Sequence, residues 1–153
     1  MRMTIVATQL SAANSAPQRA KTTMAIQAAI SAVHTAAETD WAQVVTLYDQ
    51  LLVVAPGPVA ELNRAVAVAE TAGPEAALAL VDALPLGDYQ LFHAVRADLL
   101  RRLGRTGEAV AAYREAIDRT ENGPARTFLA RRLAALTAEP VPQRTRTAVR
   151  PSA

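Results

Sequence analysis

The chain has 153 residues, 51% of them hydrophobic but only 4% aromatic, with no cysteine and a formal net charge of +2. This length can bury one domain's core, and the lack of cysteine excludes a disulfide framework and thiol chemistry. The same lack fits a reducing compartment, so we expect a cytoplasmic protein. Because aromatic and β-branched runs are scarce, the composition favours closely packed helices over a sheet.

The excess positive charge lies towards the two ends of the chain. Residues 41–140 hold ten arginines and twelve acidic residues, whereas the flanks hold six basic residues against Glu38 and Asp40. A folded nucleic-acid-binding face would concentrate basic residues within the domain. The pattern therefore predicts no sequence-specific DNA binding by this chain. Weak, salt-dependent contact through the arginine-rich tail stays open as an alternative.

The two terminal segments lack a sustained hydrophobic period. Residues 1–20 predict a flexible N-terminus, whose apolar part, residues 3–10, is too short and polar for a good export signal. Residues 139–153 are proline-broken and basic, which predicts a disordered tail. No stretch approaches the ~20 apolar residues of a membrane span. Residues 21–138 are thus the predicted helical domain.

Two helices are expected before residue 56. The first begins at Lys21 with Thr22 or Thr23 as its N-cap, and Asp40 caps the second. Proline cannot continue a helical hydrogen-bond ladder, so the Pro-Gly-Pro sequence at 56–58 ends the second helix. The expected inward-facing residues are Ile26, Ile30, Val33, Trp41, Val44, Val45, Tyr48, Leu51 and Leu52.

Prolines and a glycine also delimit the next two expected helices. Pro58 suits the first turn of the third helix, which ends at Gly73 and has Leu62, Val66 and Ala69 facing inward. Pro74 then opens a short fourth helix that Pro85 closes.

Residues 88–119 predict two antiparallel helices about a tight turn. Gly104 stands where a helix C-terminus needs a left-handed residue, and Thr106 is the expected N-cap of the following helix. An apolar residue recurs every four positions in the first helix, and small alanines alternate with large residues in the second. These residues are Leu91, Val95, Leu99 and Leu103, then Ala109, Val110, Ala112, Tyr113, Ala116 and Ile117. A last helix starts at Pro124, with Phe128, Leu129, Leu133 and Leu136 as its apolar residues.

The order of small and large residues in this hairpin resembles the tetratricopeptide repeat, a helical hairpin of about 34 residues. It comprises Ala97, Leu100, Ala109, Tyr113 and Ala116 in a unit that starts at Gln90. Related units start at Ala25 and Val59. The sequence therefore predicts an all-α fold: antiparallel helical hairpins stacked as about three degenerate tetratricopeptide-like repeats plus a terminal helix. An irregular helical bundle rich in alanine and leucine is the alternative.

Residues suited to catalysis or metal binding are sparse. His34 and His93 are the only histidines, lie 59 residues apart and have no partner at ligand spacing, so we expect both to be structural. No nucleophile elbow or glycine-rich phosphate loop is present. We therefore expect no catalytic activity, no cofactor and no metal.

Polar residues one turn away from the packing stripes would line the concave groove of such repeats. An asparagine or arginine there could hold a peptide backbone or a carboxylate by charge-assisted hydrogen bonds. A solvated charged surface is the simpler interpretation. The partner-binding candidates are Asn63, Arg64, Glu70, Asp98, Arg101 and Arg102.

Five segments closely resemble the long C-terminal extension of one group of bacterial extracytoplasmic-function RNA polymerase sigma factors. The resemblance includes low-probability strings such as NRAVA at 63–67 and RRLGR at 101–105. It implies a tetratricopeptide-like domain that tunes the attached sigma domains by contacting them or the polymerase core. The segments are residues 26–37, 39–52, 56–84, 89–117 and 128–136.

The parts of such sigma factors that read DNA are not expected in this chain. The polymerase-binding and −10-melting region two and the −35-reading region four precede the extension, and too few residues precede Ile26 to form them. The resemblance thus implies a regulatory domain of sigma-factor origin, from a truncated or split gene. A stand-alone tetratricopeptide-type adaptor that binds a peptide or protein is the alternative, and self-association is plausible.

Overall fold

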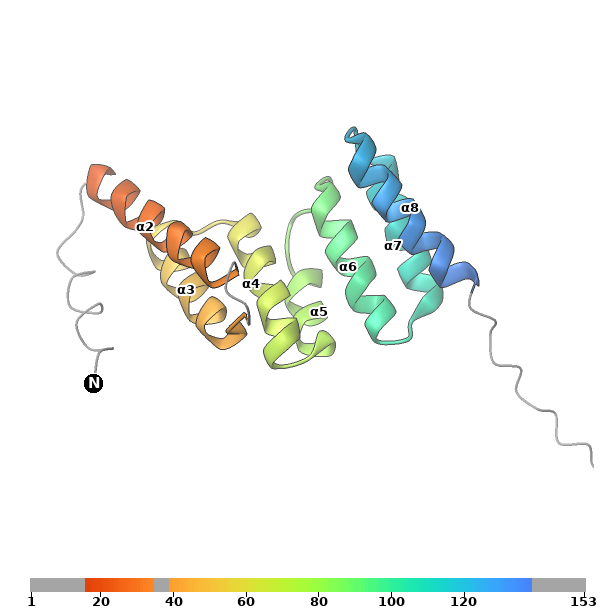
Figure 1. Ribbon diagram of the computed structural model, residues 1–153, viewed down its shortest axis with the longest axis horizontal. Coiled ribbons are helices and arrows are strands. Elements are labelled where there is room, and N and C mark those ends of the chain that lie inside the picture. The colour runs from red at the N-terminus through yellow and green to blue at the C-terminus, as the bar shows by residue number, and fades with distance from the viewer. Residues whose placement is uncertain (1–15, 35–38, 139–153) are drawn as a thin grey trace, which may run out of the picture.

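The computed structural model describes residues 16–34 and 39–138, and seven α-helices joined by short connections make up this part of the chain. Figure 1 shows them as a row of hairpins with the N-terminal and C-terminal helices at opposite ends. The helices are α2 (Ala16–His34), α3 (Trp41–Val54), α4 (Pro58–Thr71), α5 (Pro74–Asp82), α6 (Gln90–Arg102), α7 (Thr106–Asp118) and α8 (Gly123–Ala138).

Each helix packs against the next one along the chain, and α4 also touches α6 in the neighbouring hairpin. The hairpins α2/α3, α4/α5 and α6/α7 therefore stack in order, with α8 packed on α7. Contacts between sequence neighbours dominate, as in a repeat array. This arrangement confirms the predicted all-α class with stacked helices.

Several predicted helix boundaries are confirmed. The backbone N–H of Gln43 donates to Asp40 Oδ1 at 3.0 Å, so Asp40 caps α3. Pro58 and Pro74 open α4 and α5, where a missing N–H leaves no intrahelical bond unmade.

The first helix begins at Ala16, five residues before the predicted start at Lys21. Pro17 is compatible with the first turn of α2, because a first-turn N–H has no intrahelical partner and the φ angle of proline suits a helix. The predicted helix start at Lys21 is therefore five residues too late. Residues 1–15 and the predicted disordered tail, 139–153, lie outside the described residues.

The turn between α6 and α7 is closed by two backbone hydrogen bonds around a left-handed glycine. Gly104 has φ 71°, its N–H donates to the Arg101 carbonyl at 3.0 Å, and the Arg105 N–H donates to the Leu100 carbonyl at 2.9 Å. This pair of bonds is the Schellman arrangement. The prediction for Gly104 is confirmed. The prediction for Thr106 is wrong. Arg105 is the N-cap of α7, and Thr106 is already the first residue of the helix.

We expect Gly104→Ala to lower the free energy of unfolding by about 1 kcal/mol, because an L-residue is strained at positive φ. Gly107→Ala is the control: Gly107 lies inside α7 with no atom near an added Cβ, so alanine should stabilise the helix there. Urea denaturation of both variants measures the effect. Equal shifts in the same direction would show that the left-handed turn is not what matters.

The main core runs from α4 to α8 and is built largely from leucine and alanine. Leu62 and Leu100 are fully buried, and so are Ala97, Ala109 and Ala116 at the α6–α7 contact. Small residues there let the two helix backbones approach closely, as the sequence predicted. A separate cluster of Ile26, Ile30 and Leu51 holds α2 against α3.

The predicted apolar stripe of α6 is only partly buried. Leu99 is 3% exposed, but Leu91 is 37% exposed and Val95 is half-buried, while Phe92 and Leu100 are in the core. A four-residue spacing drifts by about 40° per step around a helix of 3.6 residues per turn. The stripe therefore rotates out of the α6–α7 contact towards α4.

Candidate functional site

The rotated part of the α6 stripe forms one wall of an open hollow between α4 and α6. Its volume is about 220 Å³, and most of its lining is apolar. It forms because α4 and α6 belong to different hairpins and touch sparingly. The lining residues are Val66, Ala69, Glu70, Leu91, Ala94, Val95, Asp98, Leu99 and Arg102.

Three of the predicted partner-binding residues lie at this hollow: Glu70, Asp98 and Arg102. Arg102 Nη1 donates to Glu70 Oε1 at 2.7 Å, and its Nη2 donates to the Ala69 carbonyl at 3.3 Å. This ion pair joins α6 to α4 across the hollow. The groups are partly exposed, so the pair contributes at most about 1 kcal/mol to stability.

Asp98 also binds a second predicted residue, Arg101, on the same helix. Arg101 Nη2 and Nε donate to Asp98 Oδ1 at 2.8 and 3.1 Å. This hydrogen bond and the nearby carboxylate raise the pKa of Arg101 above its ordinary value, against a smaller lowering by burial. Asp98 therefore lines the hollow and at the same time forms an ion pair with Arg101 on its own helix.

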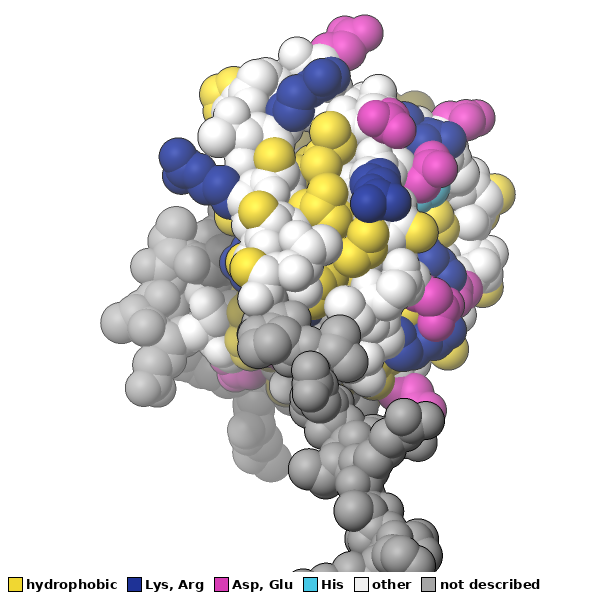
Figure 2. Space-filling model, turned by 90° about the vertical axis from the view of Figure 1, so that its right-hand side faces the viewer, with side chains coloured by type: hydrophobic (Ala, Val, Ile, Leu, Met, Phe, Trp, Pro, Cys, Tyr) yellow, Lys and Arg dark blue, Asp and Glu magenta, His cyan; other side chains and the backbone are white. Residues whose placement is uncertain are grey.

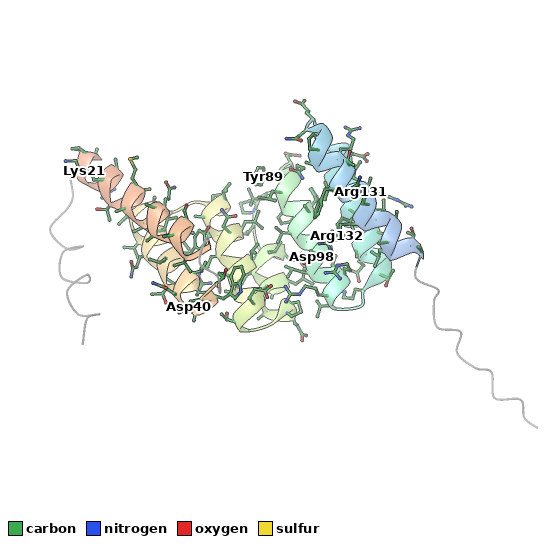
Figure 3. The ribbon with its side chains drawn as sticks, in the orientation of Figure 1. Lys21, Asp40, Tyr89, Asp98, Arg131 and Arg132 are labelled. Atoms are coloured by element: carbon green, nitrogen blue, oxygen red, sulfur yellow. The ribbon has the colours of Figure 1, made fainter. Side chains whose placement is uncertain are left out.

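The phenol of Tyr113 on α7 lies in the same electrostatic neighbourhood. Burial raises the pKa of Tyr113, the Asp98 carboxylate adds to the rise, and Arg101 and Arg132 oppose it. Figure 3 shows Asp98 on α6 and Arg132 on α8. The charged cluster thus extends from the hollow towards the last helix.

The other two predicted residues lie elsewhere on α4. Arg64 Nε donates to Asp49 Oδ1 of α3 at 2.6 Å and lines a second hollow of about 430 Å³ between α3, α4 and α5. Asn63 is half-buried and lines neither hollow. The structure therefore gathers Glu70, Asp98, Arg101 and Arg102 and separates them from Arg64. We take the smaller hollow as the candidate site because the predicted residues converge there.

The apolar lining of the site was missed from the sequence. Leu91, Val95 and Val66 were all assigned to the packed core on their spacing. The one signal in the sequence was that the apolar residues of α6 recur every four positions, a spacing that drifts around a helix and so cannot face a single neighbour along its whole length.

His93 makes the contacts of a packing residue, as expected. Its Nε2 lies 2.6 Å from the Gly87 carbonyl oxygen, to which it donates, and its ring meets Phe92 edge-on at 5.1 Å. The side chain of His34 lies outside the described residues. Within residues 16–34 and 39–138, no three histidine or acidic side chains form a group that could hold a metal ion. No helix in that part of the chain is long and apolar enough to cross a bilayer.

Comparison with known proteins shows that the chain is similar in sequence to part of a much longer protein. It is 45% identical over 123 residues to an uncharacterised protein of Rhizobium meliloti (strain 1021). The match covers 75% of this chain but 29% of the relative, so the chain spans less than a third of that protein's length. No family model and no solved structure matches the chain.

Proposed function

We propose that this chain is a non-catalytic protein-interaction domain of sigma-factor origin, which regulates transcription initiation in the cytoplasm. It acts by contacting sigma-factor domains or the polymerase core, without reading promoter DNA itself and without a cofactor. The proposal draws on the sequence resemblance across residues 26–136, on the stacked helical hairpins, and on the hollow between α4 and α6.

The hollow carries the interaction part of the proposal. Its apolar lining and charged rim suit a helix or extended segment that offers one or two apolar side chains between polar ones. Leu91, at 37% exposure, supplies apolar surface that folding leaves available. The Glu70–Arg102 pair offers both a hydrogen-bond acceptor and a donor at the rim.

The length of the relative is compatible with the proposal. The match leaves 71% of the Rhizobium protein outside the shared region, which is ample for the two sigma domains that the resemblance implies. In that setting the helical domain would act on domains of the same polypeptide.

Capture of purified sigma domains tests the proposal. Immobilised chain is offered a region-two/region-four fragment of a sigma factor from the resembled group, with and without polymerase core. We expect capture by the wild type, reduced about tenfold by Leu91→Arg, which fills the hollow and adds a charge.

Val53→Arg is the matched control, because Val53 is 74% exposed on α3 and lines neither hollow. This variant should capture the fragment as the wild type does. Failure of the wild type to capture sigma fragment or core would contradict the proposal. Full capture by Leu91→Arg would exclude the hollow as the contact.

A stand-alone adaptor that binds a peptide is the second candidate function, and the mixed charge of the rim favours it. Alanine at Asn63, Arg64 and Arg101 tests the predicted peptide contacts. Because Asn63 and Arg64 do not line the hollow between α4 and α6, and Arg64 is paired with Asp49, their replacement should matter less than that of Arg101. The reading frame upstream of Met1 separates the two functions: sigma-domain codons favour the first, and unrelated codons favour the adaptor.

A further inference from the structure

The last helix, α8, carries apolar residues on the side turned away from the core as well as on the side that packs on α7. Leu129 and Leu136 are buried, yet Phe128 on the same helix is 57% exposed. The end of a repeat array normally has a polar outer face, so an exposed phenylalanine there is unusual. Figure 2 shows the result, an apolar strip on the end of the molecule that α7 and α8 form.

The strip is flanked by positive charge that no acidic side chain of the same helix balances. Figure 2 shows Lys or Arg side chains on both sides of it, and the acidic side chains lie outside it. Helix α8 contains Arg126, Arg131 and Arg132 and no acidic residue. Arg132 lies 5.2 Å from the centre of the Phe128 ring, and Arg126 donates to the Thr120 carbonyl at 2.7 Å.

Most arginines from α4 to the end of α7 bind a carboxylate, unlike those of α8. Arg64, Arg96 and Arg102 each bind a carboxylate of another helix, with N···O distances of 2.6 to 2.7 Å. Arg101, Arg105 and Arg119 bind one on their own helix or turn. Among the described residues, Arg131 and Arg132 have no such ion pair, and neither do Arg114 of α7 and Arg126 of α8. The charge of Arg131 and Arg132 is therefore available to a partner.

A second copy of this chain is a poor match for the strip. Two α8 helices face to face would bring six arginines together. Head-to-tail stacking would set α8 against α2, which carries Arg19 and Lys21 and no acidic residue. Like charges brought together in this way oppose association. Charge repulsion therefore disfavours both α8–α8 and α8–α2 contacts between two copies of the chain.

We propose that the α8 end binds an acidic amphipathic helix of another protein or domain, with its apolar stripe on Phe128 and its carboxylates on Arg131 and Arg132. This surface is distinct from the hollow between α4 and α6, and the proposal does not depend on a sigma-factor origin. Aromatic and arginine anchors side by side are typical of the energetic centre of an interface. The arginines select an acidic helix over a neutral or basic one.

Two designed peptides of about the length of α8 test this. Both are helical with the same leucine stripe, flanked by glutamates in one and lysines in the other, and fluorescence anisotropy follows binding to the full chain. We expect the glutamate peptide to bind at least about tenfold more tightly, and to weaken as salt rises from about 0.05 to 0.5 M. Phe128→Glu should abolish binding, and the double variant Arg131→Glu/Arg132→Glu should reverse the peptide preference.

A double variant that prefers the lysine peptide must still be folded, because an unfolded variant would bind neither peptide. This result therefore separates a loss of recognition from unfolding. Leu91→Arg alters the hollow between α4 and α6 and not the α8 end. This variant should therefore bind the glutamate peptide as the wild type does, so the two proposals can fail independently. Equal binding of both peptides, or none, would overturn the proposal. A wild-type dimer that Phe128→Glu converts to monomer, with no peptide binding, would overturn it in favour of a second copy.

Discussion

Replacing Leu100 with alanine is expected to lower the free energy of unfolding by about 3–5 kcal/mol. Leu100 is completely buried in the core that joins α4 to α8, so the truncation removes apolar contacts and leaves a cavity that the neighbours fill only in part. A stack of this size has a total stability of about 5–15 kcal/mol, so the loss is a large share of it. Urea denaturation followed by circular dichroism measures the change.

Leu80→Ala is the matched control for this prediction. Leu80 lies on α5 and is 41% exposed, so the same truncation should cost about 1 kcal/mol or less. If both variants lose the same amount, burial in the stacked core is not what determines the cost.

The second large effect is expected from a substitution that adds volume. Ala109→Leu should lower the free energy of unfolding by about 1–3 kcal/mol, because Ala109 is completely buried in the core cluster that contains residues of both α6 and α7. Leucine forms helices about as well as alanine does, so the loss would reflect packing alone. Thermal unfolding followed by circular dichroism measures it.

Ala111→Leu tests the same change two residues along the same helix. Ala111 is exposed, so leucine there should leave the melting temperature within about 2 °C of the wild-type value. A comparable loss in both variants would mean that α7 does not pack through its alanines.

Most of the helical architecture could be predicted because local rules decide it. Asp40, Pro58, Pro74 and Gly104 each satisfy or omit a backbone hydrogen bond within a few residues, and all four behave as predicted. The start of α2 failed because a proline in the first turn is compatible with a helix and marks no boundary by itself.

The candidate site depended on contacts between distant segments. Glu70 and Arg102 are 32 residues apart, and no spacing rule pairs them. Leu91 and Val95 look like core residues by period, but they border a hollow because α4 and α6 belong to separate hairpins and meet only sparingly.

The sequence by itself determined the helices, their order and their pairing into hairpins, because capping, proline and glycine chemistry and hydrophobic period all act over short distances. Only the tertiary structure decided which apolar residues stay uncovered and which charges pair. Leu91 and Phe128 carry the same apolar signal as the buried Leu100. Whether each side chain is covered depends on how the helices stack, and the stacking is a property of the whole array.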